Sequence, residues 1–144
     1  MKSRPIQPYH YIIISLILWI AVEYISVWHS RFQEWMSYMP WALFQYLFII
    51  LVFSFFFYKR IWSAKKMFFL MLFMMYLFEF LWQNFLLLNP ISFVPISVLL
   101  IQLWGFLTFV PFWFVNKQLK QNSKATIFYC LWPVVGFLMA LVLG

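Results

Sequence analysis

The third apolar stretch of the chain carries a carboxylate near its middle. Glu79 lies within Met67–Leu88, which has the length and hydrophobicity of a membrane span, and Gln83 and Asn84 follow about one turn later. A carboxylate in hydrocarbon costs about 2.5–3.5 kcal/mol on insertion scales. Because a group retained at that cost is expected to serve a site, Glu79 is a candidate catalytic acid.

A second acid, Glu23, lies in the first apolar stretch, on the same helical face as Trp19. Burial favours the neutral form of a carboxyl group, and a neutral Glu can donate a hydrogen bond or a proton. Neither acid has a Lys or Arg at similar depth. We therefore expect the carboxyls of Glu23 and Glu79 to face one cavity within about 10 Å of each other, a separation that paired catalytic carboxylates still use.

Amides and aromatic residues at helical spacing are expected to complete this pocket. The predicted lining residues are Tyr76, Gln83, Asn84, Gln45, Gln102, Trp19 and Trp82. Intramembrane amides also serve simply as links between helices, worth about 0.6 kcal/mol each, and that structural role is the alternative. One cysteine and two histidines cannot build a zinc cluster. No metal site is predicted, and the sequence identifies no cofactor.

The composition is that of an integral membrane protein. Of the 144 residues, 67% are hydrophobic and only 9% are charged, whereas soluble domains have about 25% charged residues. The mean hydropathy is +0.91. The net charge of +7 comes from basic residues between apolar runs, so we interpret it as a determinant of topology and not as a nucleic-acid surface. We predict a single domain over residues 1–144.

Five apolar runs are long enough to cross a bilayer of roughly 30 Å, which takes about 20 helical residues. Pro40 suits the first turn of the second run, Pro111 and Pro133 should kink the fourth and fifth, and Asn89-Pro90 is typical of a turn. The prediction is an all-α bundle of five transmembrane helices, with spans at about 9–28, 40–58, 67–88, 91–115 and 125–144.

The basic residues predict the orientation. All but Arg31 lie on one side of the predicted spans, namely Lys2, Arg4, Lys59, Arg60, Lys65, Lys66, Lys117, Lys120 and Lys124. The positive-inside rule then makes the N-terminus cytoplasmic and the C-terminus external. Glu79 would lie about 13 Å below the outer end of its span. We expect a multi-pass protein of the cell membrane, in the bacterial inner membrane.

One stretch is similar to a known family. Leu77-Phe78-Glu79-Phe80-Leu81-Trp82-Gln83 resembles the acidic helix of the small membrane lycopene-cyclase domains, over about one helix. That family typically has a proline and two acidic residues before its Phe-Leu run, and here the proline and one acid are absent. The resemblance implies acid-catalysed ring closure of an isoprenoid, with Glu79 as the proton donor.

Three function classes are consistent with these features. The first is a pocket that binds or processes a lipid-like or isoprenoid ligand, with Glu79 and Glu23 as its acids. The second is an accessory subunit of a larger membrane complex. The third is a proton- or cation-linked transport component, which needs a polar path to the cytoplasm, and the inner half of the spans offers almost no polar residue for one. The expected partners are membrane lipids, a hydrophobic small molecule, and a second copy or another membrane subunit.

Overall fold

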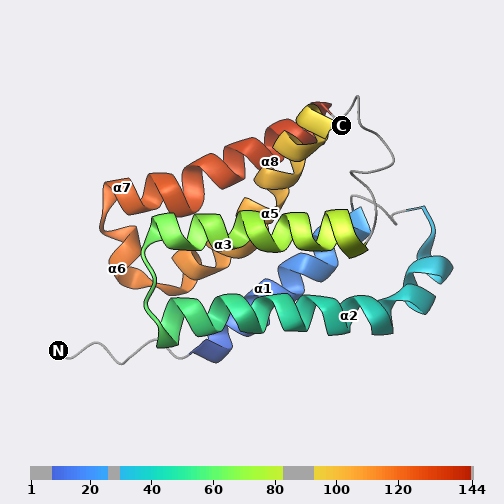
Figure 1. Ribbon diagram of the computed structural model, residues 1–144, viewed down its shortest axis with the longest axis horizontal. Coiled ribbons are helices and arrows are strands. Elements are labelled where there is room, and N and C mark those ends of the chain that lie inside the picture. The colour runs from blue at the N-terminus through green and yellow to red at the C-terminus, as the bar shows by residue number, and fades with distance from the viewer. Residues whose placement is uncertain (1–7, 26–29, 83–92, 144) are drawn as a thin grey trace. The chain divides into compact units, whose positions relative to one another are not determined.

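A computed structural model of the chain describes residues 8–25, 30–82 and 93–143 (Figure 1). All regular structure in these ranges is helical, which confirms the all-α prediction. Three continuous helical stretches are long and apolar enough to cross a membrane: Phe32–Lys59, Phe93–Val115 and Ser123–Val142. The chain divides into two compact units, Met1–Ile61 and Trp62–Gly144. The single domain of 1–144 stays a prediction.

The first unit is an antiparallel pair of helices, in which α1 packs against α2. The Tyr11 ring lies 5.5 Å from that of Phe57, and Trp19 lies 5.1 Å from Tyr46, between ring centroids. Positions early in α1 thus meet positions late in α2, which fixes the antiparallel direction. The elements are α1 (Pro8–Glu23), α2 (Phe32–Ser54) and the π-helical continuation η2 (Phe55–Lys59).

The second long helix begins earlier than predicted, because α2 starts at Phe32 and includes Pro40 in its interior. The prediction that Pro40 occupies the first turn is therefore wrong. Polar interactions support the additional turns: Glu34 accepts a 3.3 Å contact from Arg31, and its carbonyl accepts a 2.7 Å hydrogen bond from Ser37. A carboxylate in the first turn also favours a helix N-terminus. Hydropathy did not reveal these turns because they are amphipathic.

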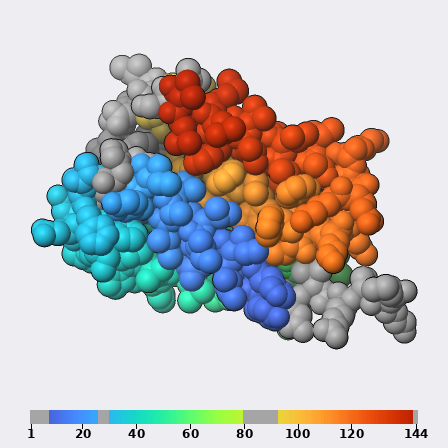
Figure 2. Space-filling view, turned by 180° about the vertical axis from the view of Figure 1, so that it is seen from behind, coloured from blue at the N-terminus to red at the C-terminus, as the bar shows by residue number. Residues whose placement is uncertain are grey.

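The second unit is organised around α5, which packs against both α3 and α8. In Figure 2 the orange-to-red atoms of residues 123–143 lie directly against the lighter orange atoms of α5. The elements of this unit are α3 (Ala64–Tyr76), η3 (Leu77–Trp82), α5 (Phe93–Val115), α6 (Lys117–Lys120), α7 (Ser123–Thr126), η5 (Ile127–Leu131) and α8 (Trp132–Leu143).

Reciprocal glycine contacts join α5 to α8. Gly105 of α5 lies under the indole ring of Trp132, and Gly136 of α8 lies under the side chain of Gln102. Because each glycine accepts a large side chain from the opposite helix, the two backbones can approach closely. Phe106 and Phe137 stack beside this contact with centroids 4.4 Å apart.

Side-chain hydrogen bonds order the connection between α5 and α8. Asn116 and Asn122 cap α6 and α7 by accepting from the backbone N–H groups of Gln118 and Ala125. Asn is favoured at such positions because its oxygen satisfies a backbone donor that the helix leaves unpaired. Thr126 both accepts from the indole of Trp113 and donates to a backbone carbonyl.

The two prolines that were predicted to kink spans occupy different positions in their helices. Pro111 is buried inside α5. Pro133 lies in the first turn of α8, directly after the π-helical segment η5. Proline cannot donate to the carbonyl four residues earlier, and a π-helical turn is one way in which a helix accommodates such a break. The kinks themselves stay predictions.

Candidate functional site

Glu79 meets a buried tryptophan of the neighbouring helix. It lies in η3 and is partly buried. The indole Nε1 of Trp104 in α5 donates to Glu79 Oε1 across 3.2 Å. Trp104 is only 2% exposed, so this bond provides an acceptor for an N–H group in a buried side chain. The hydrogen bond therefore fixes the carboxyl at the contact between α3–η3 and α5.

Within the described residues, no Lys or Arg lies at ion-pair distance from the Glu79 carboxyl. An indole N–H can only donate, so Trp104 engages one acceptor oxygen and leaves the second oxygen for another group. A carboxyl in this setting can accept a second hydrogen bond or, when protonated, donate one.

Aromatic side chains lie on the same helical stretch as Glu79. The Phe78 ring lies 6.3 Å from Trp104, between centroids. Tyr76, predicted from the sequence as a lining residue, stacks on Phe93 with centroids 6.3 Å apart and planes at 19°. Tyr76 and Phe78 thus place two aromatic rings within one helical turn of Glu79 along the chain.

Gln102 lies at the α5–α8 contact, where its side chain covers Gly136. Its Oε1 atom is buried, and no donor in the described part of the chain reaches it. The Nε1 atom of Trp132, on the opposite helix, is also buried without an acceptor there. A buried polar atom without a partner carries a desolvation penalty of about 1–3 kcal/mol, so this contact has an unsatisfied acceptor and an unsatisfied donor.

The remaining described candidates belong to the first unit. Glu23 ends α1 and is partly exposed. Trp19 and Gln45 are buried, at 7% and 5% exposure, and Trp19 lies beside Tyr46 as described above. The structure thus places Trp19 and Gln45 in the interior of the α1–α2 pair. The cavity shared by Glu23 and Glu79 stays a prediction.

Other predicted site residues lie at the end of a described range or outside the described ranges. Gln83, Asn84 and the Asn89-Pro90 turn lie outside the described residues. Trp82 is the last residue of η3. Across 8–25, 30–82 and 93–143, no three His, Cys, Asp or Glu side chains gather in a way that could hold a metal ion.

Tyr46 is the main residue that sequence reasoning did not place in a site. Trp104 lies away from the membrane interfaces in the predicted span, and its sequence position was interpreted mainly as core packing, with a pocket wall whose N–H group bonds to Glu or Gln as the alternative. The bond to Glu79 has the form of that alternative. Tyr46 is 5% exposed, and its hydroxyl is buried with no partner among the described residues. In the sequence, only its position next to Gln45 and its spacing from other polar residues indicated that Tyr46 could belong to a site.

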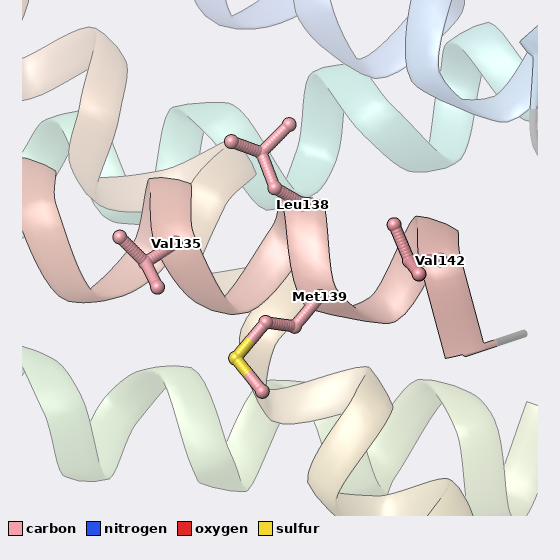
Figure 3. A pocket seen from close by; sticks show the side chains of 4 residues that line it. All are labelled: Val135, Leu138, Met139 and Val142. Carbon is pink, nitrogen blue, oxygen red and sulfur yellow. The ribbon is translucent and has the colours of Figure 1, made fainter.

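An open apolar hollow lies on α8, away from these polar groups. It is lined by Val135, Leu138, Met139 and Val142, which follow one another at helical spacing (Figure 3). Each of these side chains is at least half exposed. Such a surface suits acyl chains or an apolar helix and offers no polar chemistry.

Comparisons with protein-family models, with curated proteins and with solved structures find no match to this chain.

Proposed function

We propose that the chain is a five-span protein of a bacterial inner membrane, with its N-terminus in the cytoplasm and its C-terminus outside. Three helical stretches have the required length and hydropathy. Pro8–Glu23 is a shorter apolar helix, and α3 with η3 forms another helical stretch between Ala64 and Trp82. The orientation follows from the distribution of basic residues.

Within this frame, we propose that the second unit binds a lipid-like ligand, such as an isoprenoid, beside Glu79. The hydrogen bond between Trp104 and Glu79 carries the proposal, because it holds one oxygen of a membrane-embedded carboxyl and leaves the other for a ligand. Ionisable groups in spans mark functional sites by default. The adjacent rings of Tyr76, Phe78 and Phe93 are flat surfaces against which an unsaturated chain can pack.

The same geometry defines the chemistry of the ligand. A hydroxyl or carbonyl head can hydrogen-bond to Glu79, whereas no lysine or arginine of the described residues lies at ion-pair distance from this carboxyl to favour an anionic head. A protonated Glu79 would also be placed to donate a proton to an unsaturated chain. The ligand is therefore expected to be neutral, largely apolar and unsaturated.

Mass spectrometry of molecules that copurify with the protein tests this proposal. The chain is purified in mild detergent from its membrane, and bound lipids are compared between the parent and Glu79→Gln. We expect a neutral apolar molecule to be enriched with the parent and reduced with the variant, because the amide oxygen stays bound to the Trp104 indole and leaves only an NH2 donor where the parent offers a carboxyl oxygen to the ligand.

The matched control is Glu34→Gln, which removes a carboxylate that is 62% exposed and paired with Arg31. This variant should retain the bound molecule. If the parent, Glu79→Gln and Glu34→Gln carry the same lipids in the same amounts, Glu79 does not form a ligand site.

The accessory-subunit hypothesis is supported by a different feature, the exposed stripe of α8 (Figure 3). A second membrane helix could cover Val135, Leu138, Met139 and Val142 as readily as lipid does. Cysteine crosslinking in intact membranes tests it with Leu138→Cys, compared with Val94→Cys, which is exposed on another helix. A discrete crosslinked species from position 138 alone would support a protein partner.

A further inference from the structure

One face of α1 carries polar groups along its whole length, although most of the helix is aliphatic. Tyr11, Ser15, Trp19 and Glu23 follow one another at intervals of four residues. Each interval is about 6 Å along the helix axis. The face is buried at Tyr11, Ser15 and Trp19 and becomes partly exposed at Glu23.

At the Pro8 end of α1, two phenols and an alcohol lie together. The Ser15 hydroxyl follows Tyr11 by about one helical turn and is buried with no hydrogen-bond partner among the described residues. The Tyr58 ring of η2 lies 6.0 Å from the Tyr11 ring. Tyr11 and Ser15 are at most 1% exposed, and the Tyr58 hydroxyl is buried although the residue as a whole is partly exposed. The hydroxyl groups at this end therefore all lie inside the pair, and the Tyr58 side chain extends toward its surface.

Tyr46 of α2 continues the series toward the other end. Its ring lies beside Trp19, and its hydroxyl is buried with no hydrogen-bond partner in the described residues. Long side chains in helices point back toward the helix N-terminus. Because α2 is antiparallel to α1, the N-terminal end of α2 lies on the side of the pair where α1 ends at Glu23, so this preference would direct the Tyr46 hydroxyl along α1 toward Glu23. A hydroxyl that is buried here without a partner among the described residues can hydrogen-bond to a water molecule, and such a water can pass a proton to it.

We propose that the α1–α2 pair forms a proton pathway that connects the two ends of α1. The groups that carry the proton are, in order, Tyr58, Tyr11, Ser15, Tyr46 and Glu23. The members inside the pair are buried, and the two end residues are partly exposed, although the Tyr58 hydroxyl itself is buried. Water must therefore reach that hydroxyl for a proton to enter at the Tyr58 end.

The chemistry of these groups is suited to relay. A hydroxyl both donates and accepts hydrogen bonds, so it can take a proton on one side as it releases its own on the other. One water with hydrogen bonds of about 2.8 Å on either side bridges about 5.6 Å, which matches the spacing along α1. Glu23 is the end group that takes up or releases the proton. For each proton that enters at one end, one leaves at the other, and only O–H bonds are exchanged.

Proton flux into vesicles tests the pathway. The full chain is reconstituted into liposomes that contain a pH-sensitive dye and potassium, and valinomycin sets an inside-negative potential. We expect the parent to acidify the interior faster than protein-free liposomes do. Tyr46→Phe and Ser15→Ala should reduce the rate to that of protein-free liposomes, because each removes one hydroxyl from the series.

Two control variants match these substitutions in chemistry. Tyr9→Phe removes a phenol that is 48% exposed, and Ser97→Ala removes a buried hydroxyl of α5. Both should keep the parent rate. Tyr46→Phe retains the ring that packs beside Trp19, and its folding is checked by circular dichroism and thermal unfolding. A parent rate equal to that of protein-free liposomes, or unchanged rates in folded Tyr46→Phe and Ser15→Ala, would overturn the pathway.

Discussion

Gly105→Ala and Gly136→Ala each add one methyl group to the α5–α8 contact, but their effects on the free energy of unfolding should differ clearly. A Cβ atom at Gly105 would lie 2.5 Å from Cη2 of Trp132 and 3.1 Å from two further ring atoms. The ring is rigid, and Phe68, Phe109 and Phe128 surround it with centroids 6.1–6.3 Å away. The indole therefore cannot move aside without disturbing a cluster of aromatic rings.

At Gly136 the same methyl group would overlap the Gln102 side chain. That side chain is flexible, and its Oε1 atom has no donor to lose among the described residues. It can therefore adopt another rotamer without breaking a hydrogen bond. The two substitutions should therefore differ because a rigid ring faces Gly105, whereas a flexible amide side chain faces Gly136.

The magnitudes follow from these contacts. Overpacking a well-packed site destabilises a protein by about 1–3 kcal/mol, whereas replacing glycine by alanine inside a helix stabilises the helix by up to about 1 kcal/mol. Gly105→Ala should therefore lower the free energy of unfolding by about 1–2 kcal/mol. Gly136→Ala should change it by less than about 0.5 kcal/mol, as for substitutions without a specific mechanism of damage.

Unfolding in mixed detergent micelles, followed by circular dichroism, measures both values. The double variant Gly105→Ala/Trp132→Leu provides the control, because a smaller side chain at 132 should make room for the methyl group and give a favourable coupling energy. Equal effects of Gly105→Ala and Gly136→Ala, or no coupling in the double variant, would refute the packing described for α5 and α8.

Three further outcomes are expected. A reporter fused after Gly144 should be periplasmic and one inserted near Ser63 cytoplasmic, and the reverse would contradict the proposed orientation. Glu79→Gln should unfold at about the parent temperature if the acid is neutral, because an amide oxygen can still accept the indole N–H. A loss of several kcal/mol would instead indicate an ionised, paired carboxylate. Thr126→Val should lose about 1 kcal/mol on thermal unfolding, because the Trp113 indole loses its acceptor; an unchanged melting temperature would show that this bond contributes little.

Hydropathy predicted the helical regions well where a span is uniformly apolar. The predicted spans 91–115 and 125–144 correspond closely to the observed stretches Phe93–Val115 and Ser123–Val142. It failed at the start of α2, because the turn that contains Glu34 is amphipathic and Pro40 suggested a boundary. Proline is tolerated within a membrane helix when neighbouring groups compensate for the missing donor, so its position alone does not mark an end.

The sequence could identify single residues of the site but not their partners. Glu79 was evident from the cost of a carboxyl in hydrocarbon, whereas its donor Trp104 depends on the register between two helices. The sequence placed Ser15 on the same helical face as Trp19 and Glu23, but the hydroxyls of Tyr11 and Tyr46 were missed when the inner half of the spans was judged apolar, because an isolated Tyr is ordinary in membrane helices. Only the pairing of α1 with α2 reveals that they form a series.

A crystal structure of the chain purified with its native lipids would test the ligand site at Glu79 directly. We expect electron density for an apolar molecule whose polar head lies within hydrogen-bond distance of the Glu79 carboxyl, next to the bond from Trp104. Density in which protein side chains alone fill the space around that carboxyl would contradict the proposal and leave Glu79 as a link between α3–η3 and α5.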